Sequence, residues 1–286
     1  MKTSNVILTA GAIAVCLSLT ISARADYAST VLADNPMSFW QFNDASSANG
    51  ATAADSASGG LSPGLYEGGI SFVSGPGTGG NGIQLNGGSG GSGSFIDVVD
   101  NSYTSPAYRL ESATSFSIEL WEKSSPQASE TYARLISHAD GGTGNYMLGM
   151  NQNGANAGQP FLNVPGSTSY GWPPNLANGA WNYVVLTYSG ATANLYVNGT
   201  LEGTFTGSGA FTPPGTYQDL LLGAEGNQYY VYNCFVGDMA DVAYYGYALT
   251  QSQITAHLDA VPEPASMALL GLGFLASIVA LRRRSA

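Results

Sequence analysis

Short runs of alternating apolar and polar residues recur along most of the chain, and turn-forming residues separate them. Each run has the length of a strand, and Gly, Asn, Ser and Pro stand between the runs. Many short strands at modest spacing predict an all-β sandwich or barrel. The expected strands are residues 37–42, 82–85, 95–99, 116–122, 135–138, 146–150, 181–188, 193–197, 201–205, 220–222 and 235–244.

Two local patterns predict particular elements. Ala193, Leu195 and Val197 alternate with polar positions up to Asn198-Gly199, a pair that supplies the positive φ angles of a two-residue type I′ hairpin. Near the end of the strand region, Thr250 is followed three residues later by Gln253, which is the spacing of a capping box. Ile254 and Leu258 then give a short helix its apolar stripe.

Both ends of the chain differ from this pattern. Lys2 precedes an apolar stretch and then Ala23-Arg24-Ala25, so residues 1–25 are interpreted as a secretory signal peptide. Residues 26–260 form the expected folded domain. The glycine- and serine-rich stretch at 74–94 contains a strand pattern of its own, and it is interpreted as two loops inside that domain.

The C-terminal segment 261–286 has three parts in a fixed order. Pro262-Glu263-Pro264 comes first, an uncharged apolar run at 265–281 follows, and Arg282-Arg283-Arg284 ends the run. Seventeen residues sit at the lower limit for a transmembrane helix, and the arginines favour a cytoplasmic end. An ordinary single-span anchor would look similar.

The order of these parts resembles the PEP-CTERM sorting signal of Gram-negative bacteria. The resemblance implies that an exosortase-type membrane enzyme recognises the tail and cuts near Pro262-Glu263-Pro264. The implied location is the cell surface or the extracellular matrix, with a transient anchor in the inner membrane.

Charge and cysteine content narrow the possible partners. Only Arg109, Lys123 and Arg134 are basic within residues 26–260, against 18 of the 19 acidic residues of the chain. Binding to nucleic acid requires basic side chains that neutralise phosphates, so nucleic acid is excluded, and a polyanionic polysaccharide would be repelled unless divalent cations bridged it. Cys234 is the one cysteine after the signal peptide, so the domain has no internal disulfide.

Several runs together resemble LamG-like domains of the concanavalin A-like type. These runs are residues 33–44, 55–59, 82–87 with 95–98, 116–121, 181–188 followed by 195–199, and 237–250, all in the family's order. The block Trp-Asn-Tyr-Val-Val-Leu-Thr-Tyr at 181–188, with Leu-Tyr-Val-Asn-Gly at 195–199, is the most specific. The resemblance implies a two-sheet antiparallel jelly-roll sandwich with a short C-terminal helix. Trp40, Trp121 and Trp181 are then expected in its core, and the alternative is that one of them stacks on a sugar.

Glycoside hydrolases of the same fold carry Glu-x-Asp-x-x-Glu on one strand. The nearest run here is Glu119-Leu120-Trp121-Glu122, which lacks the aspartate. Its two glutamates are expected on opposite faces of a sheet, because strand side chains alternate. His138 with Asp140 is interpreted as a strand-end pair, and His257 falls on the predicted helix. Catalysis is therefore not expected.

The family resemblance also implies a possible calcium ion. Related domains often bind Ca²⁺ at loop carboxylates and carbonyls, since this ion prefers oxygen ligands. The corresponding residues are Asp44, Asp55 and Asp241. Where many members have two successive acids in the last strand, this chain has Ala240-Asp241. The alternative is that these residues are acidic surface groups that keep an exported protein soluble.

Loop aromatics are the candidate ligand-binding residues. They are Tyr170, Trp172, Tyr229, Tyr230 and Tyr232, with asparagine and glutamine side chains nearby in sequence. Aromatic faces beside amides suit sugar rings, although such aromatics can also fill gaps between loops. Three functions remain open: a lectin-like module for the cell's own exopolysaccharide, a structural matrix protein without a discrete ligand, and a hydrolase or lyase with unrecognised residues. We expect the first.

Overall fold

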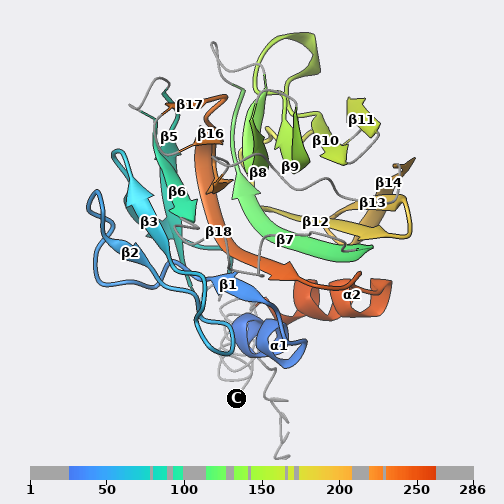
Figure 1. Ribbon diagram of the computed structural model, residues 1–286, viewed down its shortest axis with the longest axis horizontal. Coiled ribbons are helices and arrows are strands. Elements are labelled where there is room, and N and C mark those ends of the chain that lie inside the picture. Colours follow the sequence, from blue (N-terminus) through green and yellow to red (C-terminus); the bar gives the residue numbers. More distant parts are fainter. Residues whose placement is uncertain are drawn as a thin grey trace, which may run out of the picture.

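The computed structural model describes residues 26–77, 80–88, 93–98, 114–126, 132–140, 143–164, 167–170, 174–207, 219–227 and 230–261. Most of the strands lie in two antiparallel sheets packed face to face (Figure 1). The predicted two-sheet sandwich is therefore confirmed. The hydrophobic cores described below are built within residues 26–261, so this segment holds its own core.

The first sheet, sheet A, has its strands in the order β14-β13-β12-β7-β18-β5-β4. Two strands share one edge of β18: β5 pairs with its residues 236–239, and β1 pairs with its residues 242–244. The strands are β1 (Ser38–Trp40), β4 (Ser71–Ser74), β5 (Asn81–Asn86), β7 (Ser115–Lys123), β12 (Asn182–Ser189), β13 (Thr192–Val197), β14 (Thr200–Thr206) and β18 (Val236–Tyr245).

The second sheet, sheet B, has the order β11-β10-β9-β8-β15-β6-β3-β2. Its strands are β2 (Thr52–Ala53), β3 (Gly64–Glu67), β6 (Phe95–Val98), β8 (Ala133–Asp140), β9 (Thr143–Met150), β10 (Pro160–Val164), β11 (Ser167–Tyr170) and β15 (Leu220–Leu222). A small hairpin of β16 (Glu225–Asn227) and β17 (Tyr230–Tyr232), a 3₁₀ turn at Gly154–Asn156, and the helices α1 (Tyr27–Ala33) and α2 (Gln251–Ala260) complete the described elements.

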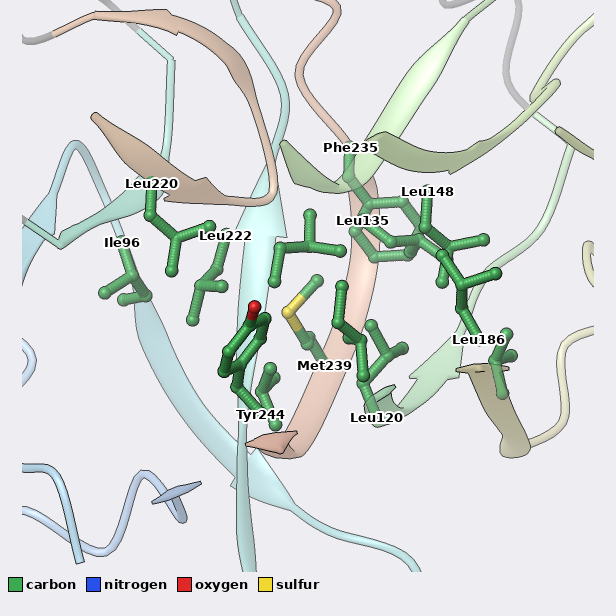
Figure 2. Packing of buried hydrophobic residues seen from close by; sticks show 14 of the residues in the cluster. Ile96, Leu120, Leu135, Leu148, Leu186, Leu220, Leu222, Phe235, Met239 and Tyr244 are labelled. Atoms are coloured by element: carbon green, nitrogen blue, oxygen red, sulfur yellow. The ribbon is translucent and has the colours of Figure 1, made fainter. Parts of the chain in front are cut away.

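The inner faces of the two sheets form one large hydrophobic core. Leu120 and Met239 of sheet A point toward Leu148 and Leu222 of sheet B, as Figure 2 shows, and all four are fully buried. Burial of a side chain of this size contributes about 1.5–3 kcal/mol. The alternating pattern that predicted the strands therefore describes this core directly.

Both local predictions are confirmed. Asn198 and Gly199 have φ angles of 50° and 78° and join Val197 to its cross-strand partner Thr200. Thr250 and Gln253 form the predicted capping box at the start of α2. The turn also packs on the helix, because the Gln251 side chain donates a hydrogen bond of 2.8 Å to the Gly199 carbonyl.

The three tryptophans are not all in the inter-sheet core. Trp40 is fully buried there, and its indole N–H donates to the Ser62 carbonyl at 2.9 Å. Trp121 is buried on the opposite face of sheet A, under the helices, and Trp181 is only partly buried beside it. The core prediction is confirmed for Trp40 and Trp121, which lie in two different hydrophobic cores. It is wrong for Trp181, because alternation assigns a residue to a face but does not reveal how completely that face is covered.

A buried carboxylate organises that outer face. The Glu119 side chain, on β7, accepts hydrogen bonds from the hydroxyls of Tyr27, Tyr183 and Tyr245. Its second oxygen also lies 2.8 Å from Nδ1 of His257 on α2. Glu119 thus links β12, β18, α1 and α2 to its own strand, β7. We refer to these five residues, with Asp34, as the Glu119 network.

His257 extends the network to the surface. Its Nε2 lies 3.0 Å from the carboxylate of Asp34, which follows α1 and is partly exposed. Burial alone would lower the pKa of His257. The hydrogen bond to Glu119 and the negative charge of Glu119, together with the charge and hydrogen bond of Asp34, outweigh burial and raise this pKa. The protonated imidazole is therefore the favoured partner of the two carboxylates.

Glu122 lies on the other face of β7, which confirms the prediction that Glu119 and Glu122 point in opposite directions. It is fully buried and accepts hydrogen bonds from Asn182 (2.7 Å) and Ser124 (3.0 Å). Burial raises the pKa of Glu122 to about 8, although these two hydrogen bonds oppose the shift. The side chain is therefore largely a neutral carboxylic acid at pH 7.

Replacing Glu119 should strongly destabilise the domain. The variant Glu119→Ala leaves three tyrosine hydroxyls and a buried histidine without their acceptor, and we expect a loss of about 3–5 kcal/mol in the free energy of unfolding. Asp34→Asn is the matched control at the exposed end of the network, and it should cost under about 1 kcal/mol. Urea unfolding of residues 26–261 measures both, and equal losses would contradict a central role for Glu119.

Stability should fall as pH rises from 5 to 8. The folded domain holds a proton on Glu122 up to a pKa of about 8, whereas the unfolded chain releases it near 4.5, so the folded state binds more protons in this window. One such group lowers the free energy of unfolding by up to about 1.4 kcal/mol for each pH unit. Glu122→Gln mimics the neutral acid and should flatten the profile measured by urea unfolding at each pH. An unchanged slope would contradict the neutral state of Glu122.

Candidate functional site

Of the five predicted ligand-binding aromatics, the structure describes the side chains of two. Tyr230 and Tyr232 lie on the same face of β17 with their ring centroids 6.1 Å apart, and Tyr230 is 58% exposed. The backbone of Tyr170 ends strand β11. Trp172 and Tyr229 lie outside the described residues. Sugar binding at these five residues stays a prediction.

Two of the three predicted calcium ligands use their oxygens within the fold. Asp44 accepts hydrogen bonds from the Ala54 amide and the Tyr66 hydroxyl. The Asp55 carboxylate accepts hydrogen bonds from three backbone amides, those of residues 39, 57 and 62, and so fixes the loop after β2. Over the described ranges, no three His, Cys, Asp or Glu side chains gather as a metal site would require.

Asp241, the third, is in a different position. It lies where the pairing of β18 with β7 shifts between Ala240 and Ala243, and its φ angle is 50°. Such a bulge redirects a side chain, and an unfavourable φ angle often marks a functional position. Asp241 is only 8% exposed, and no donor in the described part of the chain hydrogen-bonds its carboxylate.

The Asp241 carboxylate lines a cleft of about 370 Å³ at the end of the domain where α1 begins. The other lining residues are Asp26, Tyr27, Ala28, Gln41, Asn43, Pro76, Gly80 and Val261. Burial, and then the charge of Glu119, raises the pKa of Asp241 to about 8. A carboxyl group in this state gains strongly from a positively charged partner. We call this space the Asp241 cleft.

A second cleft lies on the outer face of sheet A, on β5, β7 and β18. Its volume is about 250 Å³, and its lining residues are Gln84, Leu85, Asn86, Lys123, Ser124, Ser125, Gly179, Val236, Gly237 and Asp238. Gln84, Asp238 and Lys123 stand side by side across these three strands, in register. We call this space the Lys123 cleft.

Trp181 does not line the Lys123 cleft, but its ring lies beside Lys123, which does. The Lys123 ammonium lies 5.8 Å from the centre of the Trp181 ring and 3.2 Å from the Asp238 carboxylate. A Cβ added at Gly82 would approach the ring to 3.2 Å, so the missing side chain at this position lets the indole lie close to β5. The cleft therefore holds an ion pair and amide groups, and an aromatic ring lies beside it.

Sequence reasoning missed both clefts. The pattern Gly82-Ile83-Gln84-Leu85-Asn86 places polar side chains outward, but only strand order brings Gln84 beside Asp238. It also missed His257, although the capping box puts this residue one turn after Ile254, on the buried face of α2. His138 is buried as well, and its ring lies tilted against that of Tyr146 with the centroids 5.7 Å apart, while the side chain of Asp140 is not described.

The predicted membrane span at 265–281 lies outside the described residues. Within the described ranges, which end at Val261, neither helix has the length and apolar character needed to cross a bilayer.

Two solved structures illustrate the likeness of the fold. The binding domain of Paraclostridial Mosquitocidal Protein 1 matches with a TM-score of 0.58 and 14% identity, over 80% of this chain and 53% of that one. The receptor binding domain of Botulinum neurotoxin type G matches with a TM-score of 0.53 and 13% identity, over 79% and 51%. This chain thus spans about half of those structures, and the likeness concerns the fold. No curated protein matches the chain.

Two family models match successive parts of the chain. The model of the PEP-CTERM protein-sorting motif matches residues 260–284, which marks an exported protein of Gram-negative bacteria and implies processing by an exosortase-type system. The second model matches residues 97–255, more than half of the chain, and it covers β7, β12 and β18, the strands that carry Glu119, Tyr183 and Asp241. The chain is therefore a member of the concanavalin A-like lectin/glucanase superfamily with a PEP-CTERM sorting motif after its folded domain.

Proposed function

We propose that this protein is a lectin-like module of the cell surface or extracellular matrix that binds a neutral polysaccharide in the Lys123 cleft. The observation that carries the proposal is the aromatic ring of Trp181 beside the polar row of Gln84, Asp238 and Lys123. Sugar rings offer apolar faces to aromatic side chains and hydroxyls to amides and charged groups. The fold it shares with binding domains favours the same class of function over catalysis.

The charge of the site selects a neutral ligand. Lys123 is paired with Asp238, so the cleft presents a balanced ion pair. The folded domain around it is rich in carboxylates, which would repel a polyanion. A cleft of about 250 Å³ is small beside common ligand pockets of roughly 300–1,000 Å³. It therefore suits one or two sugar rings of a longer chain.

Substitution of the aromatic surface should abolish most of the binding. We expect Trp181→Ala to weaken binding of residues 26–261 to the producing organism's exopolysaccharide by at least tenfold, about 1.4 kcal/mol. Calorimetric titration measures this. Gln84→Ala is the second variant, because this exposed side chain should change affinity without changing the fold.

Tyr230→Ala is the matched control, since it removes an exposed aromatic ring that does not line the cleft. Unchanged affinity in Tyr230→Ala together with a loss in Trp181→Ala would support the Lys123 cleft. The reverse result would assign binding to the β17 aromatics. A folded domain that binds no glycan would favour the structural matrix protein instead.

Loss of the sorting motif should keep the protein in the membrane. We expect a chain with Pro262-Glu263-Pro264 changed to Ala-Gln-Ala to stay in the inner-membrane fraction with its tail attached, because the processing enzyme loses its recognition segment. Intact mass of the protein in the membrane and released fractions measures this. Gln251→Ala, on the exposed face of α2, should be processed normally. Normal release of the altered chain would contradict recognition at this segment.

A further inference from the structure

Asp241 is a buried carboxylate without a described cationic side chain to neutralise it. The structure describes two lysine or arginine side chains, and both are paired elsewhere, Lys123 with Asp238 and Arg134 with Glu225 at 2.6 Å. Neither lines the Asp241 cleft. His257 faces Glu119 and Asp34. A cation for Asp241 must therefore come from outside the described side chains.

The cleft also contains the first residue of the domain. Asp26 lines it together with Asp241. The Asp26 carboxylate already caps α1 by accepting the Ser29 amide at 2.7 Å, and its carbonyl accepts the Thr30 amide at 3.1 Å. The backbone nitrogen and the second carboxylate oxygen of Asp26 make no hydrogen bond within the described part of the chain, and of these two only the nitrogen can carry a positive charge.

The position of Asp26 is held by its neighbour. The Tyr27 ring packs edge-on against Phe39, Trp121 and Tyr183, and its hydroxyl reaches Glu119. The negative charge of Asp241 is close enough to contribute to the raised pKa of Tyr27, after burial and Glu119. The start of α1 is therefore anchored beside the bulge that carries Asp241.

We propose that removal of the signal peptide creates the missing cation: the α-ammonium group of Asp26 pairs with the carboxylate of Asp241. Hydrolysis of the Ala25–Asp26 bond consumes one water, leaves a carboxylate on Ala25 and frees an amine on Asp26, which takes up a proton at neutral pH. The proposal rests on the proposed export of the chain and on cleavage after Ala23-Arg24-Ala25.

Pairing with the α-ammonium group would turn the buried Asp241 carboxyl group, which lowers the stability of the fold, into part of a stabilising salt bridge. A buried acid that would otherwise hold its proton becomes an ionised partner in a salt bridge. Before cleavage the same nitrogen is an uncharged amide, so the precursor lacks this contact. The exported form should consequently be more stable than the precursor, through a contact between its first residue and its last long strand.

The test compares residues 26–261 with three N-termini: a free amine on Asp26, an acetylated Asp26, and an extension of four residues before Asp26. We expect the folding equilibrium constant of the free-amine form to exceed those of the other two by about tenfold at pH 7. In Asp241→Asn the three forms should be equally stable. Urea unfolding gives these constants, and Asp238→Asn, another little-exposed acid of β18, is the control that should keep the difference.

A second measurement reports on the amine itself. An acylating reagent at pH 7 should modify the Asp26 amine about tenfold more slowly in the folded domain than in the folded Asp241→Asn variant, as followed by mass spectrometry. Equal rates in the two proteins, or equal stability of the three N-terminal forms, would overturn the proposal.

Calcium is the competing occupant of the cleft. If added Ca²⁺ stabilises the free-amine form, if chelator reverses this, and if Asp241→Asn removes the response, a metal ion occupies the cleft and the proposal fails. These experiments use purified domains with defined ends, so they are independent of glycan binding. The N-terminal mass of the exported protein separately reports whether cleavage follows Ala25.

Discussion

The burial of one carboxylate, that of Glu119, is the constraint on which the outer layer of the domain depends. A charged group removed from water must find enough donors to replace its hydration. Three tyrosines and a histidine from four different elements meet that need. Because α1 and α2 carry two of these donors, the helices have one position on sheet A where the carboxylate is satisfied, and the ends of the domain are fixed with them.

The two clefts follow from how far this helical layer extends. Where α1 meets the bulge in β18, the layer ends and leaves the Asp241 cleft. Beyond Trp121 and Trp181 the face of sheet A is no longer covered, and the polar row of the Lys123 cleft begins. One cleft therefore contains residues from both ends of the folded chain, whereas the other is built on strands. This division suits a structural role for the first and a ligand-binding role for the second.

Features set by neighbouring residues could be predicted from the sequence. The Asn198-Gly199 turn and the Thr250 capping box depend on a few adjacent residues, and both occur as expected. Eleven of the described strands could be predicted for the same reason, whereas the short or edge strands β2, β3, β4, β10, β11, β16 and β17 were missed. α1 was missed because a seven-residue segment next to a signal peptide shows little periodicity, and its stability comes from Tyr27 reaching Glu119, 92 residues away in sequence. The candidate site was harder still, since a register shift decides where Asp241 points.

The arrangement of the two helices also determines how the domain is displayed while its tail is attached. α1 and α2 lie together at one end of the sandwich, and the hairpin of β16 and β17 lies at the opposite end (Figure 1). Val261 packs against the helical layer, so the folded domain ends at the helix end of the sandwich. A chain anchored through the residues that follow Val261 would thus hold the helix end nearest its anchor. The hairpin end, which carries the exposed ring of Tyr230, would lie farthest from that anchor.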